Sequence, residues 1–569
     1  MHIEIKPFHI QKHLVQFDIQ LENLDAGEHI LQWPTWRPGR YEQAHYAQNV
    51  LELVASHAGE QVVIQKITKD KWRFATKVKG TLTITYFYYA HQMDAGASWL
   101  DDDQLYLNFV NCVPYIQNRQ KELITIHLDI PDDYQVATSL KKVRSKKCEA
   151  RDYDELVDSP LIASRKLSMQ SYNIDGTTFY VWINGECDPD WDKLLNDFTR
   201  FSESQISLFG GYPSAEFHFL FQILPYRHYH GVEHKNSTVI SLGPSDQLNT
   251  DKLQTDLLGI SSHELFHIWN IKRIRPQELI PYEYDREQYF DTGYIAEGVT
   301  TYYGDLMLVR SGVFSAQDYL KEINIYLKRH FENDGRHRAS LTQSSIDLWI
   351  DGYKSGLAGR KVSIYIKGAL IALILDLKIR ELSENRQSLD DVMRSMWAHF
   401  GDLEKGYTSF SYRQIIEELT EQDWDWYFED CVEGTLDLKE LLKDVFDHVG
   451  CEMRLKHSED NLKRWVGIEV MPIQGKFQII KTAVSSPGEA FFSVRDEITA
   501  INNSPMTSLT EELLNVGGKN IIEIVRAGEK KSVTVNLNSQ SYFDVYEVVE
   551  KEKPSTDEVI NFKRWTLGK

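Results

Sequence analysis

Hydrophobic and polar residues alternate along much of the first 165 residues of the chain. Two clear examples are Val15-Gln-Phe-Asp-Ile-Gln-Leu and Gly80-Thr-Leu-Thr-Ile-Thr-Tyr-Phe-Tyr-Tyr. A period of two is typical of strands that bury one face and expose the other. The pattern therefore predicts an all-β N-terminal domain over residues 1–165.

The pattern changes in the middle of the chain. Apolar segments rich in β-formers flank one helical pattern near residues 191–209, and Asp175-Gly176 marks a hairpin turn. From about 252 to 447 the apolar residues recur with helical spacing, for example from Leu370 to Leu382. A sheet followed by helices predicts an α+β domain over residues 166–450.

Short strand patterns return after about residue 460 and end near Val535. They predict a small β-rich domain over residues 451–545, followed by a charged C-terminal tail at 546–569 that is rich in Glu and Lys. A chain of 569 residues is also long for one domain, so we expect a multidomain protein.

Composition narrows the class of protein. With 42% hydrophobic residues and only 32 Gly and 16 Pro, the chain is neither collagen-like nor largely disordered. Its 63 basic and 84 acidic residues leave a net charge of −21, which argues against nucleic acid as a partner. Five scattered cysteines without a Cys-x-x-Cys pair cannot close a complete disulfide framework, so reduced thiols are expected.

The N-terminus, Met1-His-Ile-Glu-Ile-Lys-Pro, lacks the basic start and the apolar stretch of a signal peptide. A secreted chain trimmed of its signal would look the same. The longest apolar run, Ala369 to Leu375, is far shorter than the roughly 18–20 residues that cross a bilayer. We therefore expect a cytoplasmic protein without a membrane span.

The sharpest chemical signal is His263-Glu-Leu-Phe-His267 in a helical stretch. Residues four apart share one helix face, so His263 and His267 can bind one metal ion while Glu264 addresses a bound water. The plainer interpretation is a solvated pair of histidines with a glutamate on a surface helix. The residues around this motif distinguish a metal site from a surface helix.

A catalytic zinc usually takes three protein ligands and one water, so a third ligand is expected downstream. Glu297 is the candidate, in Tyr294-Ile-Ala-Glu-Gly-Val-Thr-Thr-Tyr-Tyr at the start of a second helical pattern. A glutamate there would also stabilise the helix dipole without any metal.

At this point the residues resemble a known family. The stretch from His263 through Arg273-Ile-Arg-Pro-Gln-Glu-Leu, followed by Ala296-Glu-Gly-Val-Thr-Thr-Tyr-Tyr, is similar to the glycyl aminopeptidases, which are zinc gluzincins with a PDZ domain. Trp36-Arg-Pro-Gly-Arg-Tyr41 and His230-Gly-Val-Glu-His234 resemble two further family elements. The resemblance implies a thermolysin-like catalytic domain with one zinc ion per chain, held by His263, His267 and Glu297.

The resemblance also implies residues that bind substrate. Glu233 would pair with the ammonium of a free peptide N-terminus and fix the first residue in register, with Gly231 and His234 beside it. A strand-end carboxylate in solvent is the alternative for Glu233. His228 and His230 could line the cleft, but an exposed loop explains them better.

Tyr365, in Val362-Ser-Ile-Tyr-Ile-Lys-Gly-Ala, resembles the family's Tyr-x-Lys-Gly element. By resemblance its phenol would donate to the oxyanion of the tetrahedral intermediate. The alternative is a tyrosine that packs in a helix and donates to some carbonyl.

Near the C-terminus, Trp465-Val-Gly-Ile468 and Ser485-Ser-Pro-Gly-Glu-Ala490 resemble a PDZ domain. The first segment would be the loop that holds a peptide carboxylate beside an open strand edge, so a C-terminal peptide is a possible partner. Equally, the module could only pack against the catalytic domain.

The resemblance implies a zinc aminopeptidase that acts on peptides with a free N-terminus and favours Gly or Ala there. Two other functions stay open. One is an endopeptidase that recruits substrates through the PDZ-like domain. The other is a non-catalytic binding protein with a structural zinc, although a structural site needs no general base such as Glu264 and normally fills all four positions.

Overall fold

The computed structural model describes residues 1–354, 356–402, 404–508 and 513–568. It divides into two compact units, each made of several stretches of chain. The first comprises Met1–Ser315, Ser345–Ser355 and Gln387–Asp423, and the second comprises Ala316–Ser344, Gly356–Arg386 and Trp424–Lys569. The chain is thus multidomain, as predicted.

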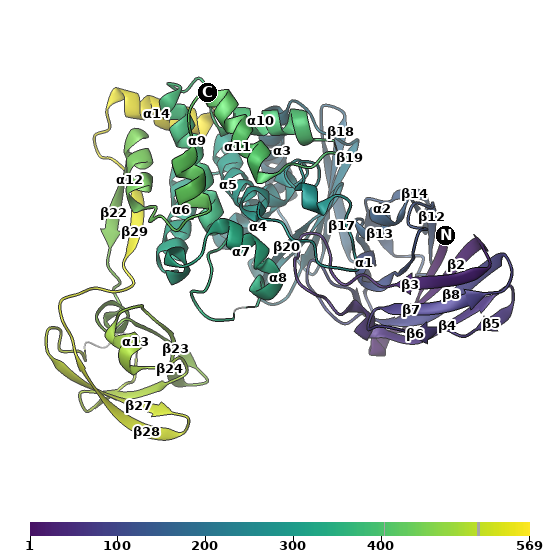
Figure 1. The fold of residues 1–569 in the computed structure, drawn as a ribbon, viewed down its shortest axis with the longest axis horizontal. Coiled ribbons are helices and arrows are strands. Elements are labelled where there is room, and N and C mark those ends of the chain that lie inside the picture. The colour runs from purple at the N-terminus through teal and green to yellow at the C-terminus, as the bar shows by residue number, and fades with distance from the viewer. Residues whose placement is uncertain (355, 403, 509–512, 569) are drawn as a thin grey trace. The chain divides into compact units, whose positions relative to one another are not determined.

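The N-terminal 165 residues are rich in strands, as their alternation predicts (Figure 1). The largest sheet has eight strands in the order β14-β15-β12-β1-β2-β8-β4-β5. Their bounds are Lys141–Arg144, Lys147–Ala150, Ile124–Leu128, His2–His9, Leu14–Leu24, Gly80–Tyr89, Val50–His57 and Glu60–Val62. Alternate side chains of β1 and β2, such as Ile3, Ile5, Val15 and Phe17, are fully buried in one core.

Two four-stranded sheets complete this region, in the orders β11-β3-β7-β6 and β13-β16-β10-β9. The strands are Tyr115–Ile116, Gly27–Gln32, Lys71–Thr76 and Gln65–Lys66 in the former, and Gln135–Thr138, Leu161–Ser164, Gln104–Leu107 and Trp99–Leu100 in the latter.

A five-stranded mixed sheet follows, in the order β17-β18-β19-β21-β20. Its strands are Leu167–Ile174, Thr177–Asn184, Glu216–Ile223, Ser237–Gly243 and His228–Glu233. The three middle strands are parallel, whereas β20 joins antiparallel to β21 and forms an edge. An apolar cluster that includes Ala95, Tyr106, Leu220 and Val232 packs the β10 sheet against this one. The edge strand β20 is thereby held beside the N-terminal region.

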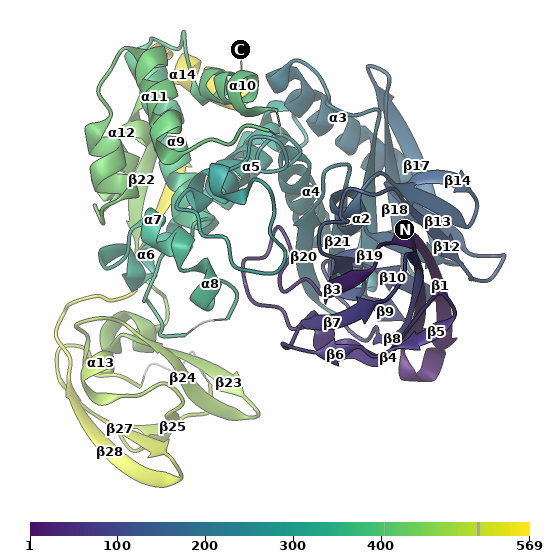
Figure 2. The ribbon, with the colours of Figure 1, turned by 45° about the vertical axis from the view of Figure 1, so that its right-hand side comes forward.

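Helices complete the first unit (Figure 2). They include α3 (Trp191–Phe209), α4 (Asp251–Phe266), α5 (Thr300–Arg310), α10 (Leu389–Phe400) and α11 (Ser409–Thr420). Helix α4 packs against β20, β21 and α5. Its start is fixed by the Thr250 hydroxyl, which accepts from the Leu253 amide at 3.4 Å, and Asp251 favours the helix dipole.

The second unit contains helices α6 (Ala316–Phe331), α9 (Ile366–Leu382) and α12 (Lys439–His448), and the two-stranded ribbon of β22 (Cys451–Lys456) and β29 (Val545–Glu550). A second sheet has the order β23-β24-β25-β27-β28, with β26 paired to β25, and surrounds its own core. These strands are Ile468–Ile473, Lys476–Thr482, Glu497–Ile501, Lys519–Arg526, Glu529–Asn536 and Ser504–Pro505. The β-rich character matches the sequence pattern, and the PDZ assignment stays a prediction.

The charged segment predicted as a tail is ordered. It contributes strand β29 and then helix α14 (Thr556–Leu567), which begins with a capping box between Ser555 and Glu558. Trp565 of this helix is fully buried and its ring lies 5.4 Å from that of Tyr319 in α6. One apolar anchor therefore fixes a helix whose composition is mostly polar. Among the described helices, none is long and apolar enough to cross a membrane.

Candidate metal centre and cleft

The two histidines of the helical motif meet at one point, together with Glu297. His263 and His267 present their Nε2 atoms 3.0 Å apart, and Glu297 Oε2 lies 3.7 Å and 3.4 Å from them respectively. Ligand bonds of about 2.0–2.2 Å in a tetrahedral zinc site separate neighbouring donors by about 3.3–3.6 Å. The donor types and their spacing therefore fit a three-residue zinc site.

Glu297 is presented by an irregular helical segment. Residues Tyr294–Val299 form a π-helix that leads into α5, and such segments are frequent at functional sites. All six side chains of the segment are buried. The Glu297 carboxylate is therefore buried and surrounded by protein.

Asn270 links the two halves of the site; it lies inside the stretch that resembles the family, but the sequence predicts no role for it. Its backbone oxygen lies 3.0 Å from His267 Nδ1, and its side-chain amide donates to the carbonyl of Ile295 at 2.8 Å and to Thr300 Oγ1 at 2.9 Å. A ligating histidine commonly donates its second ring N–H to such an acceptor, which fixes the ring orientation. Asn270 thus orients His267 and ties the α4 end to the segment that carries Glu297.

Replacing Asn270 with alanine keeps the backbone oxygen that faces His267 but removes the amide bonds to Ile295 and Thr300 that hold this oxygen in place. Zinc binding should therefore weaken, by up to the roughly 10- to 100-fold typical of disturbed outer-shell partners. The measurement is competition for zinc with a chromogenic chelator. Asn249→Ala is the matched control, because Asn249 is exposed and donates only to the Asp188 carbonyl. Equal zinc affinity in both variants would show that the Asn270 side chain does not help to position His267.

Glu264 lies beside this triad with one atom unsatisfied. The side chain is buried, and in the part of the chain that the structure describes its Oε2 has no hydrogen-bond partner. Burial raises the pKa of Glu264 well above its ordinary value, and the Glu233 and Glu297 carboxylates raise it further. The Glu264 Oε2 atom lies next to the three metal donors and has no partner among the described residues. It can therefore accept a hydrogen bond from a water molecule or take up a proton during the reaction.

The carboxylate of Glu297 behaves differently. Burial acts to raise its pKa, but the charge of His267 and the hydrogen bonds of both imidazoles outweigh burial and lower the pKa to about 2. Glu297 is therefore ionised, as a metal ligand must be.

The predicted ammonium-binding residue lies close to these groups. Glu233 ends strand β20 and is 5% exposed, and its carboxylate, that of Glu264 and the His267 ring present ligand atoms within 4.8 Å of one another. Glu233 is thus not a solvated strand end.

Two glycines allow close approach to the carboxylates. A Cβ atom at Gly231 would lie 2.2 Å from Glu264 Oε1, and one at Gly39 would lie 2.5 Å from Glu233 Oε2. Gly39 also has φ of +82°, which favours glycine. The loop Trp36–Tyr41 therefore lies directly over Glu233, although the two are far apart in sequence.

His234 and His230 differ from their expected settings. His234 is buried, with Nδ1 3.3 Å from Asp158 Oδ1, and the same carboxylate binds Lys272 at 2.7 Å. The expected exposed loop around His228 and His230 is wrong, because both belong to strand β20. His230 Nδ1 accepts from the Ala95 amide at 3.3 Å, and this contact fixes the N-terminal region against β20.

Two tyrosines are relevant to the site. Tyr365 is the N-cap of α9 in the second unit, so its role as an oxyanion donor stays a prediction. Tyr353, which the motifs did not single out, lies in the first unit, where its hydroxyl accepts from the Tyr41 amide at 3.2 Å. Burial raises the pKa of Tyr353, and the carboxylates of Glu297 and Glu233 add to this effect. A second phenol therefore lies near the metal donors.

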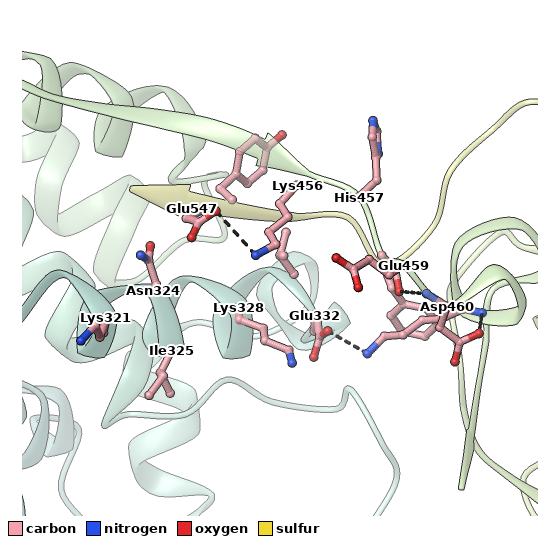
Figure 3. A pocket seen from close by; sticks show the side chains of 15 residues that line it. Lys321, Asn324, Ile325, Lys328, Glu332, Lys456, His457, Glu459, Asp460 and Glu547 are labelled. Carbon is pink, nitrogen blue, oxygen red and sulfur yellow. Dashed lines mark hydrogen bonds and ion pairs between the residues drawn. The ribbon is translucent and has the colours of Figure 1, made fainter. Parts of the chain in front are cut away.

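The second unit has a cavity of its own, of about 520 Å³, between α6, the β22–β29 ribbon and the segment after β22 (Figure 3). Its charged residues pair with one another: Lys463 lies 2.9 Å from Glu332, and Lys456 lies 3.6 Å from Glu547. None of the predicted site residues is among the described residues that line it. The metal centre remains the better candidate for the functional site.

Comparison with known proteins agrees with this assignment. A model of the M61 peptidase N-terminal domain matches residues 2–165, and the model described as M61 glycyl aminopeptidase matches residues 256–371, a range that includes His263, His267 and Glu297. The chain belongs to the M61 glycyl aminopeptidase family. It is accordingly a zinc-dependent metallopeptidase of the aminopeptidase type, and the resemblance seen in the sequence is confirmed at the level of the family.

Solved structures support the fold of this M61 family member. An aminopeptidase N family protein from Idiomarina loihiensis is 24% identical, covers 99% of both chains and superposes with a TM-score of 0.91. An M1 zinc metallopeptidase from Deinococcus radiodurans is 14% identical over 77% of this chain and 94% of that chain, with a TM-score of 0.49, too low to argue from. No curated protein matches the chain.

Proposed function

We propose that the protein hydrolyses the N-terminal residue from peptides, with His263, His267 and Glu297 as the zinc ligands. The observation that carries this proposal is the buried Glu233 carboxylate, whose oxygen lies within 4.8 Å of ligand atoms of Glu264 and His267. A carboxylate at that distance can pair with a substrate ammonium while the first peptide bond reaches the metal. The test compares a substrate with a free amine and its N-acetylated twin.

Several residues take part in hydrolysis, each with a separate role. Bound zinc would polarise the substrate carbonyl and lower the pKa of a water molecule. Glu264 accepts the proton from the attacking water and passes it to the leaving amine. Glu233 holds the ammonium, and β20, which ends with Glu233, is an edge strand of its sheet that can pair with the peptide backbone.

His234 acts here as a support of Glu233 and not as a direct contact. Its ring is bound to Asp158, which also accepts from the Lys235 amide at 2.8 Å. These bonds fix the backbone that follows Glu233. A preference for glycine or alanine at the first substrate position is part of the proposal and rests on the family resemblance.

Tyr365 completes the proposal as the donor to the developing oxyanion. Tyr365→Phe should lower kcat by about 10²- to 10³-fold with little change in KM, because the donor acts mainly in the transition state. Tyr353→Phe is the matched comparison, since Tyr353 is the phenol near Glu233 and Glu297. Normal turnover in Tyr365→Phe together with a large kcat loss in Tyr353→Phe would move the role to Tyr353.

A further inference from the structure

Arg37 is a buried cation that has no carboxylate in direct contact among the described residues. Arg37 is 4% exposed, and its Nη1 donates to the Pro38 carbonyl at 3.4 Å. Within the described residues, no carboxylate oxygen lies within 4.0 Å of the guanidinium. A guanidinium carries five N–H donors, and buried charges are almost always paired. Most N–H donors of Arg37 therefore lack a carboxylate at hydrogen-bond distance among the described residues, and an anion from outside the chain could supply one.

The guanidinium is held flat against the backbone at Gly96. A Cβ atom at Gly96 would lie 2.2 Å from Nη2 and 2.4 Å from both Cζ and Nε. Gly96 is itself fixed, because its amide donates to Asp94 Oδ1 at 2.7 Å and its carbonyl accepts from Asn111 at 2.9 Å. Gly96 therefore covers one face of the guanidinium. The N–H groups at the edge of the guanidinium are held in a fixed orientation in which they can bind a ligand.

The neighbouring acid, Asp94, has other partners. Its carboxylate accepts from Gly96 and from Gln92 Nε2 at 2.7 Å, and it lies 3.7 Å from His230 Nδ1. These bonds direct Asp94 towards its own loop and β20. Arg37 interacts with Asp94 at longer range, since burial raises the pKa of Asp94 while the charges of His230 and Arg37 lower it, but none of the described carboxylate oxygens of Asp94 is within 4.0 Å of the guanidinium.

The surroundings of Arg37 touch the metal centre on two sides. Gly39, two residues along the same loop, lies against the Glu233 carboxylate. Ala95, next to Gly96, donates to the ring of His230, and the following residue, Gly231, lies against Glu264. Arg37 is thus linked by short contacts to the groups that would hold and cleave the peptide.

We propose that Arg37 binds the C-terminal carboxylate of a short peptide whose N-terminal ammonium is held by Glu233. This inference rests on the proposed function and names its substrate class, which is free peptides of two or three residues. Such peptides span at most about 7–11 Å when extended. A guanidinium binds a carboxylate through two parallel hydrogen bonds, a geometry that a single backbone carbonyl does not offer. The cleft would then recognise both ends of its substrate by opposite charges.

The test measures kcat/KM for Ala-Ala and Ala-Ala-Ala, for their C-terminal amides, and for alanine anilide, which has no carboxylate. The wild-type enzyme should prefer each free acid over its amide by about 10- to 100-fold, the value of a charge-assisted hydrogen bond. Arg37→Met should reduce this preference to near one while alanine anilide is cleaved at close to the wild-type rate. Arg40→Met is the matched control, because Arg40 is in the same loop but pairs with Glu42 at 2.6 Å.

Each other outcome overturns the inference. Equal turnover of free acids and amides by the wild-type enzyme rejects it without any variant, even if Arg37→Met does not fold. If Arg37→Met lowers kcat/KM for the peptides and for alanine anilide by the same factor, Arg37 has a structural role only. If the wild-type enzyme leaves alanine anilide and all the peptides intact, the proposed aminopeptidase function itself fails, and this result is distinct from equal cleavage of acids and amides.

Discussion

Replacing Glu264 with glutamine is expected to reduce turnover by about 10³- to 10⁴-fold while zinc stays bound. Glutamine keeps the size of the side chain, but its amide cannot accept the proton of the attacking water, and general-base catalysis contributes up to about 10⁴-fold. The three donors of the metal centre do not include Glu264. The measurements are kcat on alanine anilide and zinc content by elemental analysis.

Glu203→Gln is the control for the same substitution on the surface, because Glu203 is exposed on helix α3. It should retain full activity. Retention of more than a few per cent of activity by Glu264→Gln, with zinc bound, would remove Glu264 from the role of general base.

The second large effect is expected for Glu233→Gln. The free amine substrate should lose about 10²- to 10³-fold in kcat/KM, because breaking a buried charge pair costs about 2–5 kcal/mol. Turnover of an N-acetylated substrate should not fall further, since that substrate has no ammonium to bind. Discrimination between free and blocked N-termini should therefore shrink.

The N-acetylated substrate is the internal control, because it reports on zinc and Glu264 without the ammonium contact. If Glu233→Gln lowers kcat/KM for both substrates by the same factor, Glu233 supports the structure of the site and does not bind the substrate ammonium. The close contact of Gly39 with this carboxylate makes glutamine preferable to a larger side chain.

Much of the metal centre was predictable because its signal is local. Four residues make one helical turn, so the spacing of His263 and His267 places both imidazoles on one face of α4. Helix α3 follows the predicted range of 191–209 for the same reason. The ordered helix α14 was not predicted, since its docking depends largely on one buried residue, Trp565, in a charged segment.

The surroundings of the centre depend on contacts between distant parts of the chain. Arg37 lies in a motif that drew attention only as a family landmark, and its packing on Gly96 has no periodic signal. Asn270 acts partly through its backbone oxygen, which no side-chain pattern reveals. Residues of this kind become visible only when the strands and loops of the first unit are placed in space.

The most direct test of the central claim is hydrolysis of alanine anilide beside N-acetylalanine anilide, each with and without a zinc chelator. The account predicts that aniline is released from the free amine at least about 10²-fold faster than from the N-acetylated compound, because only the free amine gains the buried charge pair. It also predicts loss of this activity with the chelator and its return when zinc is restored. Cleavage of neither compound by protein with stoichiometric zinc, or equal cleavage of both, would contradict an aminopeptidase that reads the substrate ammonium through Glu233.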